Sequence, residues 1–245
     1  MSADDASTPR FLPVGDLALS VEFGNVIDPA INAAVIALDV ALAAADLPGI
    51  VETVPTYRSL LICYEPAEID HATLVGAVRS LLPSIASVSG ARAGRRWIVP
   101  VAYGGTFGSD LQDAAAVLGL SPEQVVSLHA SVDFLVYLVG FNPGAPNLGG
   151  LPPPLHIARR AVPRPHAPAS SVAIGGMQSG ITSIDSPTGW YVLGRTPVKP
   201  YDPHRSSPFL FEAGDRIRFR PIGPDDFARL ARDAAPGDAI AELEG

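Results

Sequence analysis

The chain has 245 residues, of which 47% are hydrophobic and 17% are charged, and its formal net charge is −8 at pH 7. This composition excludes a disordered protein, because disordered chains are rich in charge and poor in large apolar side chains. It also excludes nucleic acid as an expected partner, since an acidic chain repels the phosphate backbone. The length predicts either one large domain or two small ones.

The cysteine content and the N-terminal residues predict a cytoplasmic protein. The single cysteine, Cys63, can form neither an internal disulfide nor a thiolate metal cluster. Residues 1–10 are acidic and polar, unlike the basic and apolar start of a signal peptide. The longest apolar stretch, residues 33–47, is interrupted by Asp39 and Asp46 and is shorter than the ~20 residues of a membrane span. We therefore expect no membrane association, and the scattered histidines predict no metal site.

The first hundred residues alternate between strand-like and helix-like patterns. Strands are predicted over residues 17–23, 50–54, 60–64 and 97–103, and helices over residues 31–45 and 71–82. Asp28 and Pro29 form a start signal for the first helix, and Pro83 is expected to end the second. This β-α-β-β-α-β order is that of a ferredoxin-like α/β sandwich.

After residue 103 the pattern changes to two short helices and then to many short strands. One helix is expected from Ser109 to Gly119, and a capping box at residues 121–124 opens another that runs to about His129. Beyond residue 132, glycine and proline separate short strands, the clearest of which are residues 172–174, 190–193 and 216–220. Such punctuation predicts a closed or nearly closed β-barrel.

The chain is therefore predicted to be α+β, with two domains. The ferredoxin-like N-terminal domain is expected at residues 1–92 and the β-barrel domain at residues 93–245. The boundary is placed between Ser89 and Arg95, where small residues and glycines separate two apolar segments. Such a segment is typical of a linker between domains.

The first candidate for a binding site is the segment GFNPGAPNLGGL at residues 140–151. Glycine permits positive φ and close backbone approach, so that successive N–H groups can converge on an anion. Loops of this length without regular structure are uncommon unless they are functional, and the alternative is a plain connection. Phe141, Pro143 and Gly144 are the candidate substrate-binding residues of this segment.

An arginine cluster follows at residues 156–168, where Arg159, Arg160 and Arg164 occur without any acidic residue. The planar guanidinium group suits carboxylates and phosphates, and the prolines of the segment would hold it in place without helix or sheet. The even spacing puts Arg160 and Arg164 on one face of an extended segment. We predict Arg164 as a catalytic residue and Arg160 as a substrate-binding residue. The alternative is a basic turn that pairs with the protein's own acids.

Two further stretches complete the candidate site. In SSVAIGGMQSGI, residues 170–181, a buried strand ends at Gly175, a candidate substrate-binding residue, and Gln178 is a candidate catalytic hydrogen-bond donor. Further along, Trp190 and Arg195 are candidate substrate-binding residues. Their five-residue spacing on strand-like sequence puts them on opposite faces, so at most one of them lines the pocket. A lone tryptophan is otherwise more often a core residue.

These blocks together carry a family resemblance. In this order, and after YGGTFGSDL, the blocks GFNPGAPNLGGL, RRAVPRPHAP, GGMQSGI and SPTGWYVLGRTP resemble the KipI family. The resemblance covers nearly the whole chain and includes the closing GDRIRF. The family includes the B subunit of bacterial 5-oxoprolinase, the first subunit of allophanate hydrolase and half of the carboxyltransferase region of urea carboxylase. It implies a ferredoxin-like N-terminal domain followed by a cyclophilin-like β-barrel.

The chain departs from the family pattern at several positions of the candidate site. The family's loop resembles GFxPGFxYLGGL, so Ala145 and Asn147 stand where aromatic residues are expected. Thr182 stands where tyrosine is common, Val162 where threonine is common and Ser170 where glycine is common. The loss of rings beside the loop is expected to enlarge or reshape the pocket, which leaves the identity of the substrate open.

The resemblance implies a subunit of an ATP-dependent 5-oxoprolinase, which opens the cyclic amide of 5-oxoproline to give glutamate. Such a site must hold a substrate carboxylate and nucleotide phosphates together, and Arg160, Arg164, Gln178 and the glycine-rich segment would supply the groups. The sequence contains no P-loop, so ATP is expected at a site shared with a companion subunit, which the resemblance implies is of the B type of carboxyltransferase subunits. The chain alone is expected to be inactive.

Two alternatives stay open from the same motifs. The chain could be the carboxyltransferase half of a biotin-dependent urea or amide carboxylase, which needs an oxyanion site but no nucleotide. It could also be a non-catalytic inhibitor of a sensor histidine kinase, as KipI itself is. An inhibitor needs an exposed interaction surface and no polar pocket.

Overall fold

The structure is a computed structural model that describes residues 9–87 and 94–244. The chain divides into two compact units, residues 1–93 and 94–245, each with its own hydrophobic core. The predicted linker from Ser89 to Arg95 lies mostly outside the described residues.

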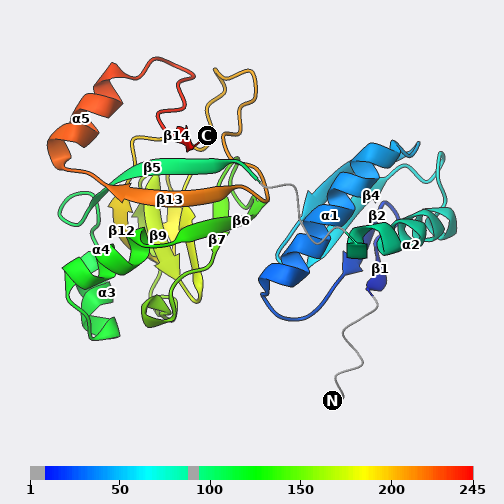
Figure 1. Cartoon of the computed structure of the whole chain (residues 1–245), viewed down its shortest axis with the longest axis horizontal. Helices are drawn as coiled ribbons and strands as arrows, with labels where there is room; N and C mark the ends of the chain where they lie inside the picture. Colours follow the sequence, from blue (N-terminus) through cyan, green and yellow to red (C-terminus); the bar gives the residue numbers. More distant parts are fainter. Residues whose placement is uncertain (1–8, 88–93, 245) are drawn as a thin grey trace. The chain divides into compact units, whose positions relative to one another are not determined.

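The N-terminal unit contains a four-stranded antiparallel sheet and two helices (Figure 1). Its elements are β1 (Arg10–Val14), β2 (Ala18–Glu22), α1 (Pro29–Ala45), β3 (Ile50–Pro55), β4 (Ser59–Tyr64) and α2 (His71–Ser87). The strand order in the sheet is β1-β2-β4-β3. The start of α1 is confirmed, because the Asp28 side chain accepts hydrogen bonds from the N–H groups of Ala30 and Ile31.

The core of this unit lies between the sheet and the two helices. Its side chains alternate along the central strands and recur at helical spacing along the helices, as a half-buried sheet covered by helices requires. Fully buried members are Leu19 and Val21 of β2, Leu60 and Ile62 of β4, Val35 and Leu38 of α1, and Leu74 and Val78 of α2.

Two predictions for this unit are wrong. The strand predicted at residues 97–103 does not join this sheet: it forms β5 of the second unit, and β1 occupies the edge beside β2. Pro83 does not end the second helix, which continues to Ser87. Leu81 and Ile85, on either side of the proline, pack against the core, so burial of apolar surface outweighs the hydrogen bond that proline removes.

The C-terminal unit is a β-barrel with helices against its wall. The strand order is β12-β9-β10-β7-β6-β13-β5-β14, and a pairing between β12 and β5 closes the sheet. The barrel strands are β5 (Arg96–Tyr103), β6 (Asp133–Val139), β7 (Pro146–Gly149), β9 (Ser171–Gly175), β10 (Gln178–Ile181), β12 (Tyr191–Arg195), β13 (Arg216–Pro221) and β14 (Glu242–Glu244). A separate ribbon pairs β8 (Arg164–Ala167) with β11 (Ser186–Thr188).

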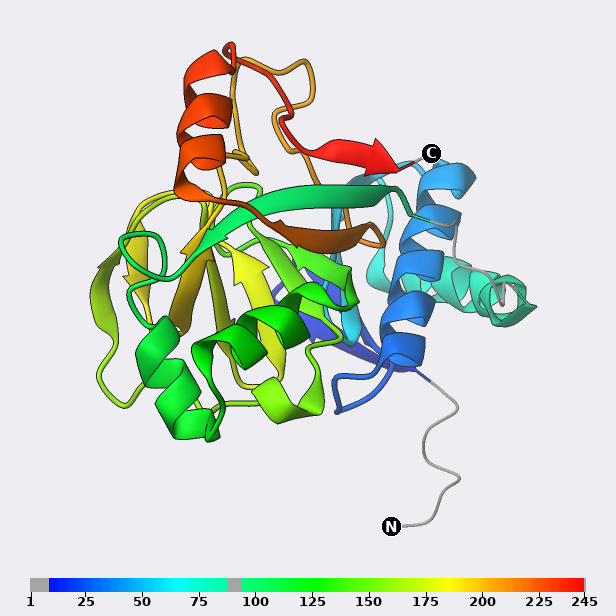
Figure 2. The same cartoon turned by 60° about the vertical axis from the view of Figure 1, so that its left-hand side comes forward.

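Three helices, α3 (Leu111–Leu118), α4 (Pro122–Ala130) and α5 (Pro224–Asp233), complete the unit. Figure 2 shows α3 and α4 side by side against the barrel and β14 beside β5. The cap at Gly119, with φ 67°, and the capping box of Ser121 with Gln124 are confirmed. The first of these helices begins after Asp110 and not at Ser109. None of the described helices is long and apolar enough to cross a membrane.

Regular structure also extends into segments that were predicted without it. Within the glycine-rich segment 140–151, β7 pairs with β6 and β10. Within the proline-rich segment 156–168, β8 pairs with β11, which corrects the prediction that this segment holds its arginines without sheet. Prolines at 163 and 165 lie before the ribbon or in its two-stranded edge, where a missing N–H leaves no buried carbonyl without a partner.

Candidate functional site

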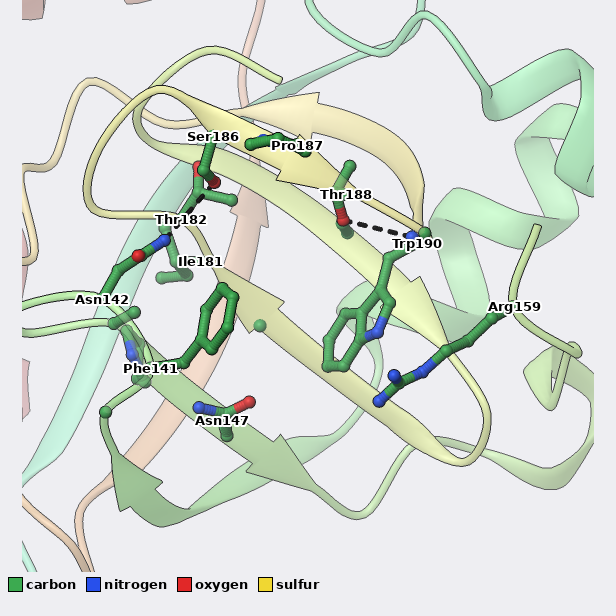
Figure 3. A pocket seen from close by; sticks show the side chains of 16 residues that line it. Phe141, Asn142, Asn147, Arg159, Ile181, Thr182, Ser186, Pro187, Thr188 and Trp190 are labelled. Atoms are coloured by element: carbon green, nitrogen blue, oxygen red, sulfur yellow. Dashed lines mark hydrogen bonds between the residues drawn. The ribbon is translucent and has the colours of Figure 1, made fainter. Parts of the chain in front are cut away.

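A cavity of about 240 Å³ lies on the outer face of the barrel wall formed by β7, β9 and β10 (Figure 3). On β9, Val172 and Ile174 belong to the barrel core, whereas Ala173 lies on the opposite face and lines the cavity. The remaining walls come from residues 140–147, Arg159, residues 180–182 and residues 186–190. Small-molecule pockets typically enclose ~300–1,000 Å³, so this cavity suits a ligand of modest size.

Trp190 forms one wall of the cavity and rests on two glycines of the barrel strands. A Cβ atom on Gly175 would lie 2.7 Å from Cγ and Cδ1 of the indole, and one on Gly180 would lie 3.2 Å from Cζ3. The backbone N–H of Trp190 donates to Oγ1 of Thr188 at 3.1 Å, which fixes the start of the strand. Any side chain at Gly175 would therefore displace the indole, so this glycine acts as the seat of Trp190.

Phe141 stands at the mouth of the cavity in an unusual conformation. Its φ is 69°, in the left-handed region that residues other than glycine rarely adopt, and 95% of the residue is exposed. The turn around it is closed by hydrogen bonds from the N–H of Gly140 to the Ala145 carbonyl at 3.0 Å and from the N–H of Ala145 to the Asn142 carbonyl at 3.1 Å. An exposed ring in a strained backbone conformation is typical of a functional position.

The arginine cluster converges on Asp110, whose side chain is fully buried. Nη1 of Arg160 donates to Oδ1 at 3.1 Å, and Arg164 donates through Nε to Oδ2 at 3.2 Å and through Nη2 to Oδ1. The N–H of Val192 donates to Oδ2 at 3.0 Å. Hydrogen bonding to Asp110 raises the pKa of the Arg164 guanidinium. The two arginines thus share one anion, and that anion belongs to the protein itself.

The pairing with Asp110 corrects the picture of Arg160 and Arg164 as free hooks for a substrate. Neither residue lines the cavity, because both side chains turn toward the buried carboxylate. Each remains partly exposed, at 26% and 30% of its side chain. The alternative of a basic turn paired with the protein's own acid is the arrangement found, and the predicted roles of both residues in catalysis stay predictions.

Arg159 is the arginine of the cluster that lines the cavity. Its Cζ atom lies 5.8 Å from the centre of the Trp190 ring, within the range of a cation–π contact. It forms no ion pair with any residue in the described part of the chain. The sequence contained a signal for this division, since Arg159 is an odd number of positions from Arg160 and an extended chain turns neighbours to opposite faces.

Of the predicted site residues, Phe141 and Trp190 line the cavity, and the others lie outside its lining. Gly144 is buried, where a Cβ atom would meet the Pro200 carbonyl at 3.0 Å. Nη2 of Arg195 donates to the Ala169 carbonyl at 3.3 Å, which agrees with opposite faces for Trp190 and Arg195. Pro143 is exposed in the turn, Gly175 supports the indole, and Gln178 is buried on β10.

Sequence reasoning missed several polar residues of the cavity. These are Asn142, Asn147, Thr182, Ser186 and Thr188. The amide of Asn142 donates to Oγ of Ser186 at 3.3 Å, and Oγ1 of Thr182 accepts from the N–H of Ser171 at 2.9 Å. Asn147 has no hydrogen-bond partner among the described residues. Figure 3 shows Asn147 between the ring of Phe141 and the indole of Trp190.

Three positions at which the sequence departs from the family pattern meet at this cavity. Ala145, Asn147 and Thr182 all line it, although they come from two strands and a turn. Because each of them is smaller than the aromatic residue expected there, the departures act on the volume and polarity of one site.

A second group of polar residues is buried inside the barrel. The Tyr103 hydroxyl lies 2.8 Å from Nδ1 of His129, Nε2 of His129 lies 2.9 Å from Oγ of Ser179, and that hydroxyl donates to the Ala173 carbonyl at 3.2 Å. The direction of the last bond assigns the proton of His129 to Nε2. Burial lowers the pKa of His129 to about 3 and raises the pKa of the Tyr103 hydroxyl. Both groups are therefore neutral at pH 7.

The described residues contain no group of three or more His, Cys, Asp or Glu side chains placed to hold a metal ion. The chemistry that the cavity offers is therefore recognition by one guanidinium group, amide and hydroxyl groups and two aromatic rings. Such a lining binds and orients a small polar ligand, and Arg159 supplies its positive charge.

Comparison with known proteins identifies relatives over nearly the whole chain. A family model described as carboxyltransferase domain, subdomain C and D, matches residues 9–211. The 5-oxoprolinase B subunit of Bacillus subtilis (strain 168) is 35% identical over 224 residues, which cover 87% of this chain and 93% of that protein. The 5-oxoprolinase B subunit of Escherichia coli O157:H7 is 40% identical over 177 residues, which cover 72% of this chain and 80% of that protein.

Both units of the chain are matched in a solved structure. The crystal structure of the K. lactis urea amidolyase is similar with a TM-score of 0.78, over 98% of this chain and 16% of that much longer one. At 21% sequence identity this likeness shows a shared fold.

Proposed function

The chain belongs to the family of carboxyltransferase domains, subdomains C and D, and we propose that it is the B subunit of a 5-oxoprolinase. The observation that carries this proposal is the match to two 5-oxoprolinase B subunits, one of them along nearly its entire length. The small cavity with its single arginine supports it, because 5-oxoproline is a small cyclic amide that bears a carboxylate.

The reaction we propose is the ATP-dependent opening of the 5-oxoproline ring. An amide carbonyl is a poor electrophile, so its oxygen attacks the γ-phosphorus of ATP and ADP leaves. Water then adds to the activated carbon, the C–N bond breaks with transfer of a proton to nitrogen, and phosphate is released with glutamate. Catalysis of such steps rests on positioning and on stabilising negative charge.

This chain is proposed to contribute the substrate-binding cavity, and a companion subunit is proposed to complete the site. No P-loop occurs in the sequence, so the nucleotide is placed at a site shared with that companion, which the family resemblance predicts to be of the B type of carboxyltransferase subunits. We propose that the isolated chain is inactive for this reason.

The test is co-expression of the chain with its companion subunit, followed by measurement of phosphate release from ATP with and without 5-oxoproline. We expect release that depends on 5-oxoproline in the complex and none with the chain alone. Native mass spectrometry of the co-expressed proteins is expected to show a stable complex. A complex that hydrolyses ATP at the same rate with and without 5-oxoproline would overturn the proposal.

The name of the family supports one other candidate, carboxyl transfer from carboxybiotin to urea or another amide. That reaction needs an oxyanion site and no nucleotide in the same active site. The two candidates separate in one assay, because only the carboxyltransferase would consume carboxybiotin in the presence of urea, and only the 5-oxoprolinase would hydrolyse ATP in the presence of the lactam.

We also propose specific fold types for the two units. The N-terminal unit would be a ferredoxin-like sandwich whose last strand is replaced at the sheet edge by β1, as supported by the order β2-α1-β3-β4-α2 and by the central position of β2 and β4. The barrel unit would be cyclophilin-like, as the family resemblance implies.

A further inference from the structure

We propose that Arg159 is the carboxylate-binding residue of the cavity and that it selects acidic cyclic amides over neutral ones of the same shape. This inference rests on the function proposed above, and it adds the residue that reads the charge of the substrate. Four features of the structure support it: the composition of the cavity, the freedom of Arg159, the anchoring of its segment and the polar group opposite.

The first feature is the charge of the cavity lining. Its sixteen lining residues, all within the described part of the chain, include one arginine and no lysine, histidine or acidic residue. A small cavity with one cation and no anion favours a ligand with a single negative charge, because a neutral ligand would leave the guanidinium without a partner. Dianions and cations are disfavoured by the same lining.

The second feature is that Arg159 is available, whereas the other arginines of its cluster are not. Arg160 and Arg164 donate to Asp110, which is fully buried and also accepts from the N–H of Val192. Arg159 is exposed and lies beside the indole of Trp190 with no carboxylate among its described neighbours. A carboxylate that enters the cavity therefore meets a guanidinium group that has no acid to exchange.

The third feature is that the segment carrying Arg159 is held in place on both sides. Ile157 and Gly176 exchange two backbone hydrogen bonds, at 3.0 and 2.6 Å. The N–H of Arg160 donates to the carbonyl of Gly189 at 2.8 Å, which places Arg159 next to Trp190. The guanidinium of Arg160 is fixed by Asp110, so Arg160 acts as a positioning residue for Arg159. Little backbone entropy is lost when a ligand binds to a segment that is already ordered.

The fourth feature is a polar group at the other side of the cavity. The amide of Asn147 has no partner among the described residues and lies between Phe141 and Trp190 (Figure 3). A side-chain amide can donate to a lactam carbonyl and accept from a lactam N–H. With the carboxylate at Arg159 and the ring amide at Asn147, the methylene groups of the ring contact the indole and the Phe141 ring.

The test compares two ligands that differ only in charge, 5-oxoproline and its neutral carboxamide, 5-oxoprolinamide. Dissociation constants are measured by calorimetry with the assembled complex, and turnover is measured as phosphate release from ATP. Arg159→Met removes the charge and keeps most of the side-chain length, and Arg159→Lys keeps the charge without the planar fork. Arg229→Met, on α5 and outside the cavity lining, is the matched control.

We expect Arg159→Met to weaken binding of 5-oxoproline about tenfold to a hundredfold and to change binding of 5-oxoprolinamide by less than about twofold. Arg159→Lys should recover part of the loss, and Arg229→Met should behave as the unmodified chain. Equal losses for both ligands would overturn the proposal, because they would mean that Arg159 binds the nucleotide phosphate or shapes the cavity. Unchanged discrimination in Arg159→Met would overturn it as well.

The outcome separates this inference from the proposed function. If the unmodified complex binds and turns over 5-oxoproline but Arg159→Met discriminates as before, only the inference about Arg159 fails. If the unmodified complex discriminates by charge through Arg159 but never hydrolyses ATP with the lactam, the proposed reaction fails and the carboxylate site stands. A complex that prefers neither ligand overturns both.

Discussion

The buried histidine of the barrel, His129, is expected to make the stability of this unit dependent on pH. Burial lowers its pKa from 6.5 to about 3, so the folded barrel keeps it neutral while the unfolded chain protonates it near pH 6.5. The contribution to stability is fully present above pH 6.5 and is lost progressively as the pH falls from 6.5 toward 3. The sign follows from the unfolded state, which binds the additional proton throughout this window.

The size of the effect follows from the two pKa values. At pH 5.5 protonation of the unfolded chain costs about 1.4 kcal/mol of folding free energy, and at pH 7.5 the cost is below about 0.1 kcal/mol. With a urea dependence of about 2 kcal/mol per M, the midpoint of unfolding should fall by about 0.7 M between these pH values. The carboxylates whose pKa is lowered, such as Asp133, titrate at lower pH and leave this window to histidine.

The assay is urea unfolding followed by tryptophan fluorescence at pH 7.5 and 5.5. Both tryptophans, Trp97 and Trp190, lie in the barrel unit, so the signal reports that unit and not the N-terminal one. Trp97 is buried in the barrel core, and its emission should shift to longer wavelength on unfolding.

The control is His129→Gln, which has polar atoms for the Tyr103 and Ser179 hydroxyls but does not titrate. This variant is expected to be less stable at both pH values and to lose about 1.4 kcal/mol of the pH dependence. His129→Leu, which also cannot titrate, serves if the glutamine variant does not fold. Equal pH dependence in the unmodified and substituted chains would refute the reasoning, because it would mean that His129 is not kept neutral by burial.

Three further outcomes are expected. Asp110→Asn should destabilise the barrel by about 3 kcal/mol, since it removes a buried partner of two arginines, whereas Asp113→Asn on the exposed side should have little effect; urea midpoints decide. Gly175→Ala should displace the indole of Trp190 and weaken ligand binding, and an unchanged emission maximum and affinity would contradict this. Limited proteolysis should cut first within residues 88–95, and first cuts inside the barrel would contradict the domain boundary.

The sequence predicted well those features that depend on neighbouring residues. Asp28 caps α1, Gly119 ends α3 in the left-handed conformation, and Ser121 forms a capping box with Gln124. Each of these signals acts across at most four positions, so a local reading contains all the partners. The closed barrel was also predicted, because short strands between glycines and prolines leave few other architectures.

The candidate site was predicted only in part, because its arrangement depends on pairs distant in sequence. Phe141 and Trp190 could be named from their segments, and both line the cavity. Asp110 was not connected with the arginines, since it lies 50 positions from Arg160 and 54 from Arg164. Without that partner, all arginines of the cluster look equally free.

The sequence by itself therefore determined the class of the fold, the order of most helices and strands and the segments that contribute to the site. The tertiary structure alone decided which sheet the strand after residue 95 joins, and which arginine stays free to bind a ligand. The physical reason is that a buried carboxylate must find positive partners wherever the fold places them. Once Asp110 has bound Arg160 and Arg164, the remaining charge of the cluster, Arg159, faces the cavity.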